Sequence, residues 1–447
     1  MFMLFNTYSF ILCFLIPVVL FYRFVPDAFR VWYLILVSVL FYAQWDRWHL
    51  FVLGGSVVVN YLFAYFIYVR GLMGGRILKR GMLFLLIGFD VGLLGYFKYS
   101  GFLNLSEGDV VLPLAISFFT FQQIAYVVDI YRGRIVLESF QRYLFFVMFF
   151  PQLVAGPIVH YSYVMKQVPK AFASGSSFIS KLSLESGGFD AGVMLFSMGL
   201  FSKVVLADSL IEQSYRSWSD IFAYSFMIYF DFSGYANMAV GLALMFGIVL
   251  PFNFDSPYRA RNLMEFWRRW HITLSDFLKE HIYIPLGGNR FGQNRQVLAL
   301  MSTMIVAGVW HGAGWNFLLW GVMHGVGLVV LHLFDVKVPK ILGIVFTFLY
   351  VSLLWVLFFS GSIDEALIIY KGLFEFDGFG ARGYDVVWLL GCAVVVWVMP
   401  NSMQIIDTKK SDFGMKSWYA YVGAILFFVS LKFMAESPSI SFVYFNF

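Results

Sequence analysis

The run ILGIVFTFLYVSLLWVLFF, from Ile341 to Phe359, contains no charged residue. Its length is close to the ~20 apolar residues that a helix needs to cross a bilayer. A helix satisfies its own backbone hydrogen bonds in lipid, whereas an isolated strand does not. The run therefore predicts a transmembrane helix, and runs of the same kind recur along the chain.

The other candidate spans follow one another from end to end of the chain: Tyr8–Phe24, Val31–Trp45, Leu50–Val69, Met82–Lys98, Leu112–Tyr131, Leu144–Val159, Ala191–Ala207, Ile221–Phe246, Val297–Val309, Trp315–Phe334, Val386–Val398 and Trp418–Phe433. They are too long and too little alternating for barrel strands. With two re-entrant segments allowed, we expect about 11–13 spans. The predicted fold is an all-α, polytopic transmembrane helical bundle with interfacial or re-entrant helices around a central cavity.

Composition indicates that lipid surrounds most of the chain. The chain is 60% hydrophobic and only 13% charged, whereas soluble domains carry about 25% charged residues. We expect one membrane-embedded domain, residues 1–447, with its core motifs in residues 229–324. The net charge of +5 lies in short loops, where it orients spans and does not indicate nucleic-acid binding. The first run lacks the basic start of a signal peptide and is expected to be retained.

The distribution of lysine and arginine predicts the orientation of the first half. The segment Arg70–Arg80 holds four basic residues and no acid, so it is expected in the cytoplasm. The N-terminus is then outside. Counting spans from this segment places the loop with Arg23 and Arg30 inside, and also the loop with Arg132 and Arg134. The loop with Glu107 and Asp109 is placed outside, so all these placements agree. Beyond Pro151 the alternation is unsafe, because Pro151–Pro157 could break a span.

Two regions are not predicted to span. Phe172–Gly188 is rich in serine and glycine and is expected to be a loop. Tyr258–Arg295 interleaves charged residues with Phe266, Trp267 and other aromatics. That pattern favours helices that lie at the interface or dip into the bundle.

His311 is the sharpest candidate for chemistry inside an apolar segment. It lies next to Trp310 in the sequence AGVWHGAGWN, where three glycines permit a bend or a close helix contact. Ionisable groups at membrane depth are costly and therefore mark function by default. The alternative is a histidine that is merely satisfied by hydrogen bonds within the bundle.

His271 is the second candidate, and its charged neighbours also permit a plain surface or headgroup role. His324 is 13 positions after His311, which places it about 220° around a straight helix. The two would share a face only if the glycines break the helix. Metal binding is not expected, because no two histidines have the i, i+4 spacing of a zinc site on one helix and no cysteine accompanies them.

Asp231 is the buried acid of interest, because long apolar runs flank it on both sides. An unpaired carboxylate is implausible there. We favour a structural ion pair with a nearby cation, and a role in orienting a histidine is the alternative.

Five ordered motifs now identify a resemblance: YFDFSGY (Tyr229–Tyr235), NFDSPY (Asn253–Tyr258), EFWRRWH (Glu265–His271), YIPLGGNR (Tyr283–Arg290) and WHG (Trp310–Gly312). Together they resemble the membrane-bound O-acyltransferase family, in particular the bacterial branch with the alginate O-acetyltransferase membrane subunit. Further matching stretches extend the resemblance over nearly the whole chain: Pro113–Gln122, Phe150–Pro157, Leu4–Asn6 and Tyr444–Phe447.

The resemblance implies a function and a place in the cell. His311 matches the family's catalytic histidine, and His271 matches its second histidine. Enzymes of this branch lie in the bacterial inner membrane as multi-pass proteins. They move an acetyl group from a cytoplasmic donor towards a polysaccharide outside. For this chain the resemblance implies an alginate-like exopolysaccharide as acceptor, with peptidoglycan, cellulose or a protein or lipid as alternatives.

The expected mechanism uses His311 as general base on the acceptor hydroxyl. His271 or Asn316 would donate a hydrogen bond to the oxyanion. Asp231, Arg268 and Arg269 would shape the site, with Trp310 as a further residue around it. The arginines could also face the donor's phosphates. The donor is expected to be acetyl-CoA or a similar acetyl thioester, without a tightly bound cofactor. A histidine could also carry the acetyl group transiently.

No large polysaccharide-binding loop is visible, so we expect a separate periplasmic partner. Two other classes of protein stay open at this point. A proton-coupled transporter would also bury histidine and aspartate, but paired broken helices in two matching halves are absent from the sequence. A non-catalytic assembly platform would share the architecture and tolerate the loss of His311.

Overall fold

A computed structural model describes most of the chain. The described residues are 3–45, 47–105, 110–154, 156–168, 188–211, 217–334, 338–374, 386–408, 410, 413–414 and 416–436. These residues form helices and loops, without strands. The all-helical prediction is therefore confirmed. Most of the predicted loop Phe172–Gly188 lies outside the described residues, as do Glu107, Asp109 and the ending Tyr444–Phe447.

The chain forms two compact units, each assembled from separate stretches of sequence. The first unit comprises Met1–Leu200, Tyr235–Pro251 and Ile406–Ser441, and the second comprises Phe201–Gly234, Phe252–Ile405 and Phe442–Phe447. The single domain and the central cavity expected from the sequence stay predictions.

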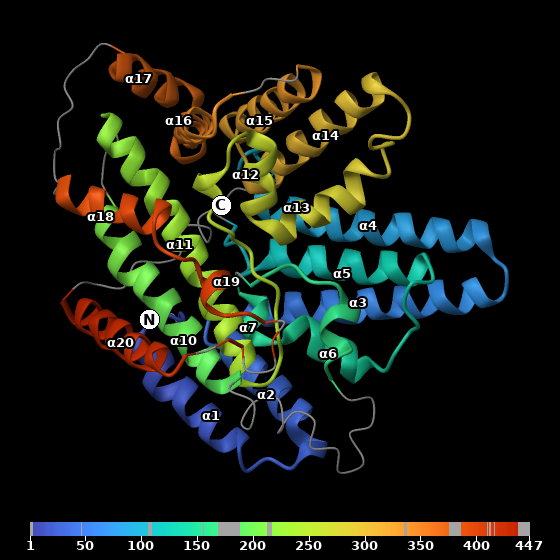
Figure 1. Ribbon diagram of the computed structural model, residues 1–447. Helices are drawn as coiled ribbons and strands as arrows, with labels where there is room; N and C mark the ends of the chain where they lie inside the picture. Colours follow the sequence, from blue (N-terminus) through green and yellow to red (C-terminus); the bar gives the residue numbers. More distant parts are fainter. Residues whose placement is uncertain are drawn as a thin grey trace. The chain divides into compact units, whose positions relative to one another are not determined.

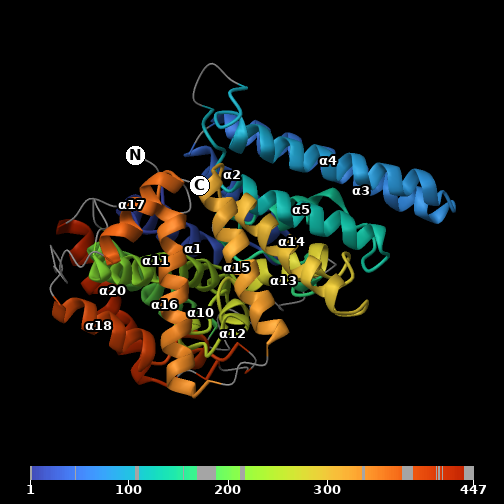
Figure 2. The ribbon, with the colours of Figure 1, turned by 90° about the horizontal axis from the view of Figure 1, so that it is seen from above.

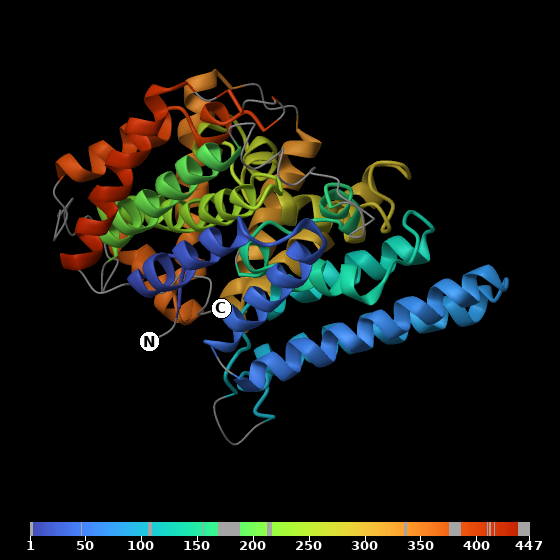
Figure 3. The same ribbon diagram turned by 90° about the horizontal axis from the view of Figure 1, so that it is seen from below.

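The first unit is built from apolar helices of very different lengths (Figure 1). Its main helices are α1 (Ile16–Tyr22, continuing a π-helical segment Ser9–Leu15), α2 (Arg30–Ala43), α3 (Arg47–Leu72), α4 (Arg76–Tyr99), α5 (Ile116–Tyr131), α6 (Phe140–Met148), α7 (Phe150–Leu153), α8 (Tyr161–Met165), most of α10 (Gly188–Phe201) and α20 (Trp418–Glu436). Helices α3, α4 and α5 run side by side (Figures 1 and 3).

The second unit holds the predicted core motifs. Its helices are the first part of α11 (Trp218–Met245), then α12 (Leu263–Arg269), α13 (Ile272–Leu278), α14 (Gln293–His311), α15 (Trp315–Leu333), α16 (Lys340–Phe359), α17 (Ile363–Phe374), α18 (Val386–Trp397) and α19 (Ser402–Ile405). Helices α14 and α15 form a tight hairpin with α16 beside α15 (Figure 2).

Five of the described helices are long and apolar enough to cross a membrane: Arg47–Leu72, Gly188–Leu210, Trp315–Leu333, Lys340–Phe359 and Trp418–Glu436. Three other predicted runs lie in long helices, α4 with 24 residues, α11 with 28 and α14 with 19, and the rest fold as shorter or broken helices. The run Leu144–Val159 breaks after Met148, continues as the short α7 and ends in extended backbone. Proline at position 151 suits the start of α7, where no backbone donor is needed.

The region Tyr258–Arg295 folds as expected into short helices instead of a span. Helices α12 and α13 have seven residues each, and a π-helical segment, Lys279–Tyr283, follows α13. The turn into α14 uses left-handed backbone at Gly287 (φ +118°) and Gly288 (φ +55°), which only glycine adopts without strain.

Candidate active site

The α14–α15 hairpin carries His311 at its closed end. Helix α14 ends at His311, and α15 begins four residues later at Trp315. A β-carbon added at Gly308 would collide with the carbonyl oxygen of Phe317, and one at Gly321 would collide with that of Met304. The two backbones therefore touch, as small residues permit in membrane helices.

Replacing Gly308 by alanine is expected to disturb this hairpin, because the added methyl group meets backbone that cannot move aside. Overpacking of this kind costs about 1–3 kcal/mol. We expect a lower melting temperature in detergent and reduced transfer activity. The matched control is Gly92→Ala in α4, where nothing lies within 4 Å of the added carbon and alanine favours the helix. Equal melting temperatures of the two variants would contradict the close contact.

Aromatic rings enclose His311. Its side chain is buried, and its ring centroid lies 5.1 Å from that of Trp320 on α15 and 5.1 Å from that of Phe358 on α16. The neighbouring Trp310 ring lies 4.8 Å away. Three helices thus exclude water from the imidazole, which strengthens every polar interaction it makes.

His271 lies between α12 and α13 and is fully buried. Neither of its ring nitrogens has a hydrogen-bond partner among the described residues. Burial lowers the pKa of His271 to about 3. The imidazole is therefore neutral at physiological pH and keeps one N–H and one lone pair available for a ligand.

The backbone of His271 is strained, with a left-handed φ of +43°. Strained residues of this kind persist only when the surrounding structure imposes them, and they gather at functional sites. The amide of the next residue, Ile272, donates to the carbonyl oxygen of Asn253 at 3.0 Å. The Oδ1 of Asn253 accepts from Thr273 Oγ1 at 2.7 Å. The motif that begins at Asn253 thus holds His271 in place.

Trp310 is close to both candidate histidines. Its ring centroid is 4.8 Å from that of His311 and 6.3 Å from that of His271. The structure therefore brings the two histidines to one aromatic side chain, although 40 positions separate them in the sequence.

His324 is another buried histidine of the second unit, and it was not among the predicted site residues. Gly312 and Gly314 break the helix, and both His311 and His324 then contact Trp320, with centroid distances of 5.1 and 4.5 Å. Trp267 Nε1 donates to His324 Nδ1 at 3.3 Å. Gly312 and Gly314 were the sequence signal for including His324, because they allow the helix break that brings His311 and His324 to the same tryptophan.

Asp231 is in a buried ion cluster, as favoured from the sequence. Lys203 Nζ lies 2.7 Å from Asp231 Oδ1 and 2.6 Å from Asp208 Oδ1. Lys203 is fully buried in the predicted run Ala191–Ala207. Sequence reasoning missed it, although a lone cation in an apolar run is itself a signal. Phe232, the residue after Asp231, contacts the ring of His271 at 4.7 Å.

The two arginines predicted to face the donor have different surroundings. Arg269 pairs with Glu265 at 2.8 Å and with Asp255 at 3.4 Å, so it joins α12 to the preceding loop. Arg268 is exposed on the same helix. A role in binding phosphates stays a prediction, and Arg268 has the more accessible guanidinium.

Asn316 uses both hydrogens of its amide for structure. Its Nδ2 donates to the carbonyl oxygens of Leu357 at 3.1 Å and Ser360 at 2.8 Å. These bonds satisfy carbonyls at the end of α16, which lack partners within the helix. Asn316 therefore joins the start of α15 to the end of α16, and the oxyanion role of His271 or Asn316 stays a prediction.

Acid is expected to destabilise the protein through His271. The pKa of a histidine in the unfolded chain is about 6.5, whereas the pKa of folded His271 is about 3. Between these two pH values the unfolded chain binds one more proton than the folded chain does. Stability from this group is therefore present above pH 6.5 and is lost as the pH falls towards 3. At pH 4.5 the loss is about 2–3 kcal/mol.

Melting temperatures at pH 7 and pH 4.5 measure this effect. His271→Asn removes the titrating group, and asparagine tolerates left-handed backbone, so its melting temperature is expected to fall less with acid. His332→Asn, near the end of α15, is the control and is expected to keep the wild-type acid sensitivity. An identical acid response in His271→Asn and wild type would refute the assignment.

The fold and the site together define a class: a helical membrane protein in which three buried histidines, His271, His311 and His324, contact tryptophan rings. Comparison with known proteins identifies its family. The model of the membrane-bound O-acyltransferase family matches residues 135–341. The chain is 38% identical to a peptidoglycan O-acetyltransferase of Helicobacter pylori, over 84% of this chain and 80% of that protein.

Two other relatives show the breadth of the family. A probable alginate O-acetylase of Pseudomonas aeruginosa is 33% identical, over 84% of this chain and 75% of its own length. A teichoic acid D-alanyltransferase of Streptococcus thermophilus is 29% identical, over 48% of this chain and 56% of its own. The chain belongs to the membrane-bound O-acyltransferase family and is an O-acyltransferase.

Proposed function

We propose that this protein moves an acetyl group from a cytoplasmic acetyl thioester, such as acetyl-CoA, to hydroxyl groups of an extracytoplasmic polysaccharide. The observation that carries the proposal is the burial of His311 at the end of α14, enclosed by aromatic rings from three helices. The names of the relatives, an O-acetyltransferase and an O-acetylase, support acetyl as the group transferred.

His311 acts as the general base in the proposed reaction. The acceptor oxygen attacks the carbonyl carbon of the thioester while its proton passes to the imidazole. When the intermediate collapses, the carbon–sulfur bond breaks and the proton goes to the departing thiolate. A positioned histidine supplies about 10²–10⁴-fold in such a step.

His271 stabilises the oxyanion in this scheme. Its neutral imidazole is buried and has no hydrogen-bond partner among the described residues, so one N–H is available for the substrate. A preorganised donor in a water-excluded site is worth about 10²–10³-fold. The donor thioester brings the reactive group itself, and the scheme needs no tightly bound cofactor.

The acceptor is proposed to be a glycan outside the cytoplasmic membrane of a bacterium. Relatives are named for peptidoglycan and for alginate, so an alginate-like exopolysaccharide and peptidoglycan are the two candidates. We further propose that a periplasmic partner protein receives or directs the acetyl group.

Ester-linked acetate in both polymers tests the proposal. Peptidoglycan and secreted polysaccharide are purified from cells with and without the gene, and the acetate released by mild base is measured. Loss of acetate from one polymer, restored by the wild-type gene, supports the proposal and names the acceptor. Unchanged acetate in both polymers, with another acylated product lost instead, would contradict it.

A further inference from the structure

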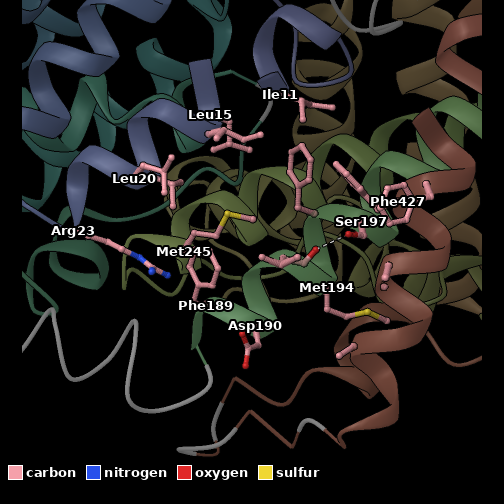
Figure 4. Close-up of a pocket in the computed structure, with 18 residues that line it drawn as sticks. Ile11, Leu15, Leu20, Arg23, Phe189, Asp190, Met194, Ser197, Met245 and Phe427 are labelled. Carbon is pink, nitrogen blue, oxygen red and sulfur yellow. Dashed lines mark hydrogen bonds between the residues drawn. The ribbon is translucent and has the colours of Figure 1, made fainter. Parts of the chain in front are cut away.

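A cavity lies in the first unit, and none of the proposed active-site residues lines it. It has a volume of about 580 Å³ and is bounded by the segment Ser9–Tyr22, by α10 and by α20 (Figure 4). Leu15, Val193 and Phe427 are among the apolar side chains that line it. Helices α10 and α20 are both in segments apolar enough to cross a membrane, so we expect lipid next to this cavity.

The charged residues of this cavity gather at one end. Arg23 follows α1 and Asp190 is in the first turn of α10, and both line the cavity near Phe189 (Figure 4). The guanidinium of Arg23 lies 5.5 Å from the centroid of the Phe189 ring. Both side chains are exposed, and within the described part of the chain neither has an ion-pair partner.

The helical segment that lines the cavity is about as long as one leaflet of a bilayer is thick. Its wall runs from Ile11 to Arg23, which is about 18 Å at 1.5 Å per helical residue. Half of a bilayer's hydrocarbon core is about 15 Å thick. A charged end followed by an apolar groove of this length suits a headgroup at the interface and an acyl chain below it.

We propose that this groove binds one phospholipid with a phosphate–amine headgroup, of the phosphatidylethanolamine type. The phosphate contacts Arg23, and the ammonium group donates to the carboxylate of Asp190. One acyl chain fills the groove between α10 and α20. One positive and one negative side chain at the same end of the groove select this headgroup. A purely anionic headgroup would meet repulsion from Asp190, and a choline headgroup has no N–H to donate.

Native mass spectrometry of the full-length protein in detergent tests the proposal. Delipidated protein receives dioleoyl phosphatidylethanolamine, phosphatidylglycerol or phosphatidylcholine at equal concentration, and bound lipid is counted. We expect one phosphatidylethanolamine retained about tenfold more strongly than phosphatidylcholine, the effect of one charged hydrogen bond. Arg23→Ala and Asp190→Asn are expected to remove that preference, while Arg76→Ala, an exposed arginine elsewhere, keeps it.

A second pair of variants tests the groove. Ala424→Phe fills it, whereas Ile425→Phe adds the same ring to the exposed side of α20. We expect lipid retention to fall about tenfold or more in the first variant only. Equal retention in both variants would overturn the proposal. The proposal would also be overturned if the protein forms a dimer that Ala424→Phe converts to monomers, because the groove would then bind a second copy of the chain.

Discussion

Cells that carry His311→Ala are expected to lose acetyl transfer almost completely while keeping the protein in the membrane. The imidazole is the proposed base, and removing a general base lowers the rate by about 10²–10⁴-fold. Ester-linked acetate on the acceptor polymer measures the loss, with membrane levels matched by immunoblot. Among the described residues, His271 is the other histidine near Trp310, and its ring centroid lies 6.3 Å from that of Trp310, compared with 4.8 Å for His311.

His332→Ala provides the matched control for this experiment. It removes the same side chain from the same hairpin, near the end of α15 and away from the aromatic rings around His311. Wild-type acetylation is expected for this variant. If a folded His311→Ala protein acetylates the polymer as fully as His332→Ala does, His311 is a structural histidine and the proposed mechanism is wrong.

Lys203→Met is expected to prevent stable folding. Lys203 is the shared cation of Asp231 and Asp208, at 2.7 and 2.6 Å, and all three side chains are buried or nearly so. Removing one partner from such a cluster leaves uncompensated buried charge, at a cost of about 3–5 kcal/mol. Yield from the membrane and melting temperature in detergent measure this loss.

Two further variants separate lost charge from lost packing. Lys432→Met removes a lysine of an exposed pair with Glu436 at 3.7 Å, and such pairs contribute at most about 1 kcal/mol. The double variant Lys203→Met with Asp231→Asn removes one of the two stranded carboxylates and is expected to recover part of the stability. Lys203→Met protein as stable as Lys432→Met protein would rule out the ion cluster.

Much of the fold was predictable because lipid leaves the backbone few choices. An uncharged run such as Ile341–Phe359 must satisfy its own hydrogen bonds and therefore forms a helix, and α16 covers nearly the same residues. The breaks were less predictable. The run Leu144–Val159 is as apolar as a span, yet Phe149 leaves helical backbone (ψ 106°) before Pro151.

The residues of the candidate site were predicted from their chemical type, as polar groups within apolar runs, and not from their positions relative to one another. His311, His271 and Asp231 were selected because buried polar groups are costly, and all three are buried. Their partners could not be predicted in the same way. Lys203 lies 28 positions before Asp231, and no periodic pattern joins residues on different helices. Asn316 was placed by type as an oxyanion donor, but its amide hydrogens are both used by α16.

The sequence by itself determined that this protein is a helical membrane protein and identified the residues able to do chemistry, since apolar length and isolated polar groups are local properties. Only the tertiary structure decided which of them meet. The contact of Trp310 with His311 and His271, and of Lys203 with two carboxylates, depends on how helices distant in sequence pack. Such packing is set by side-chain shape and by glycine contacts such as Gly308 against Gly321, which no local pattern encodes.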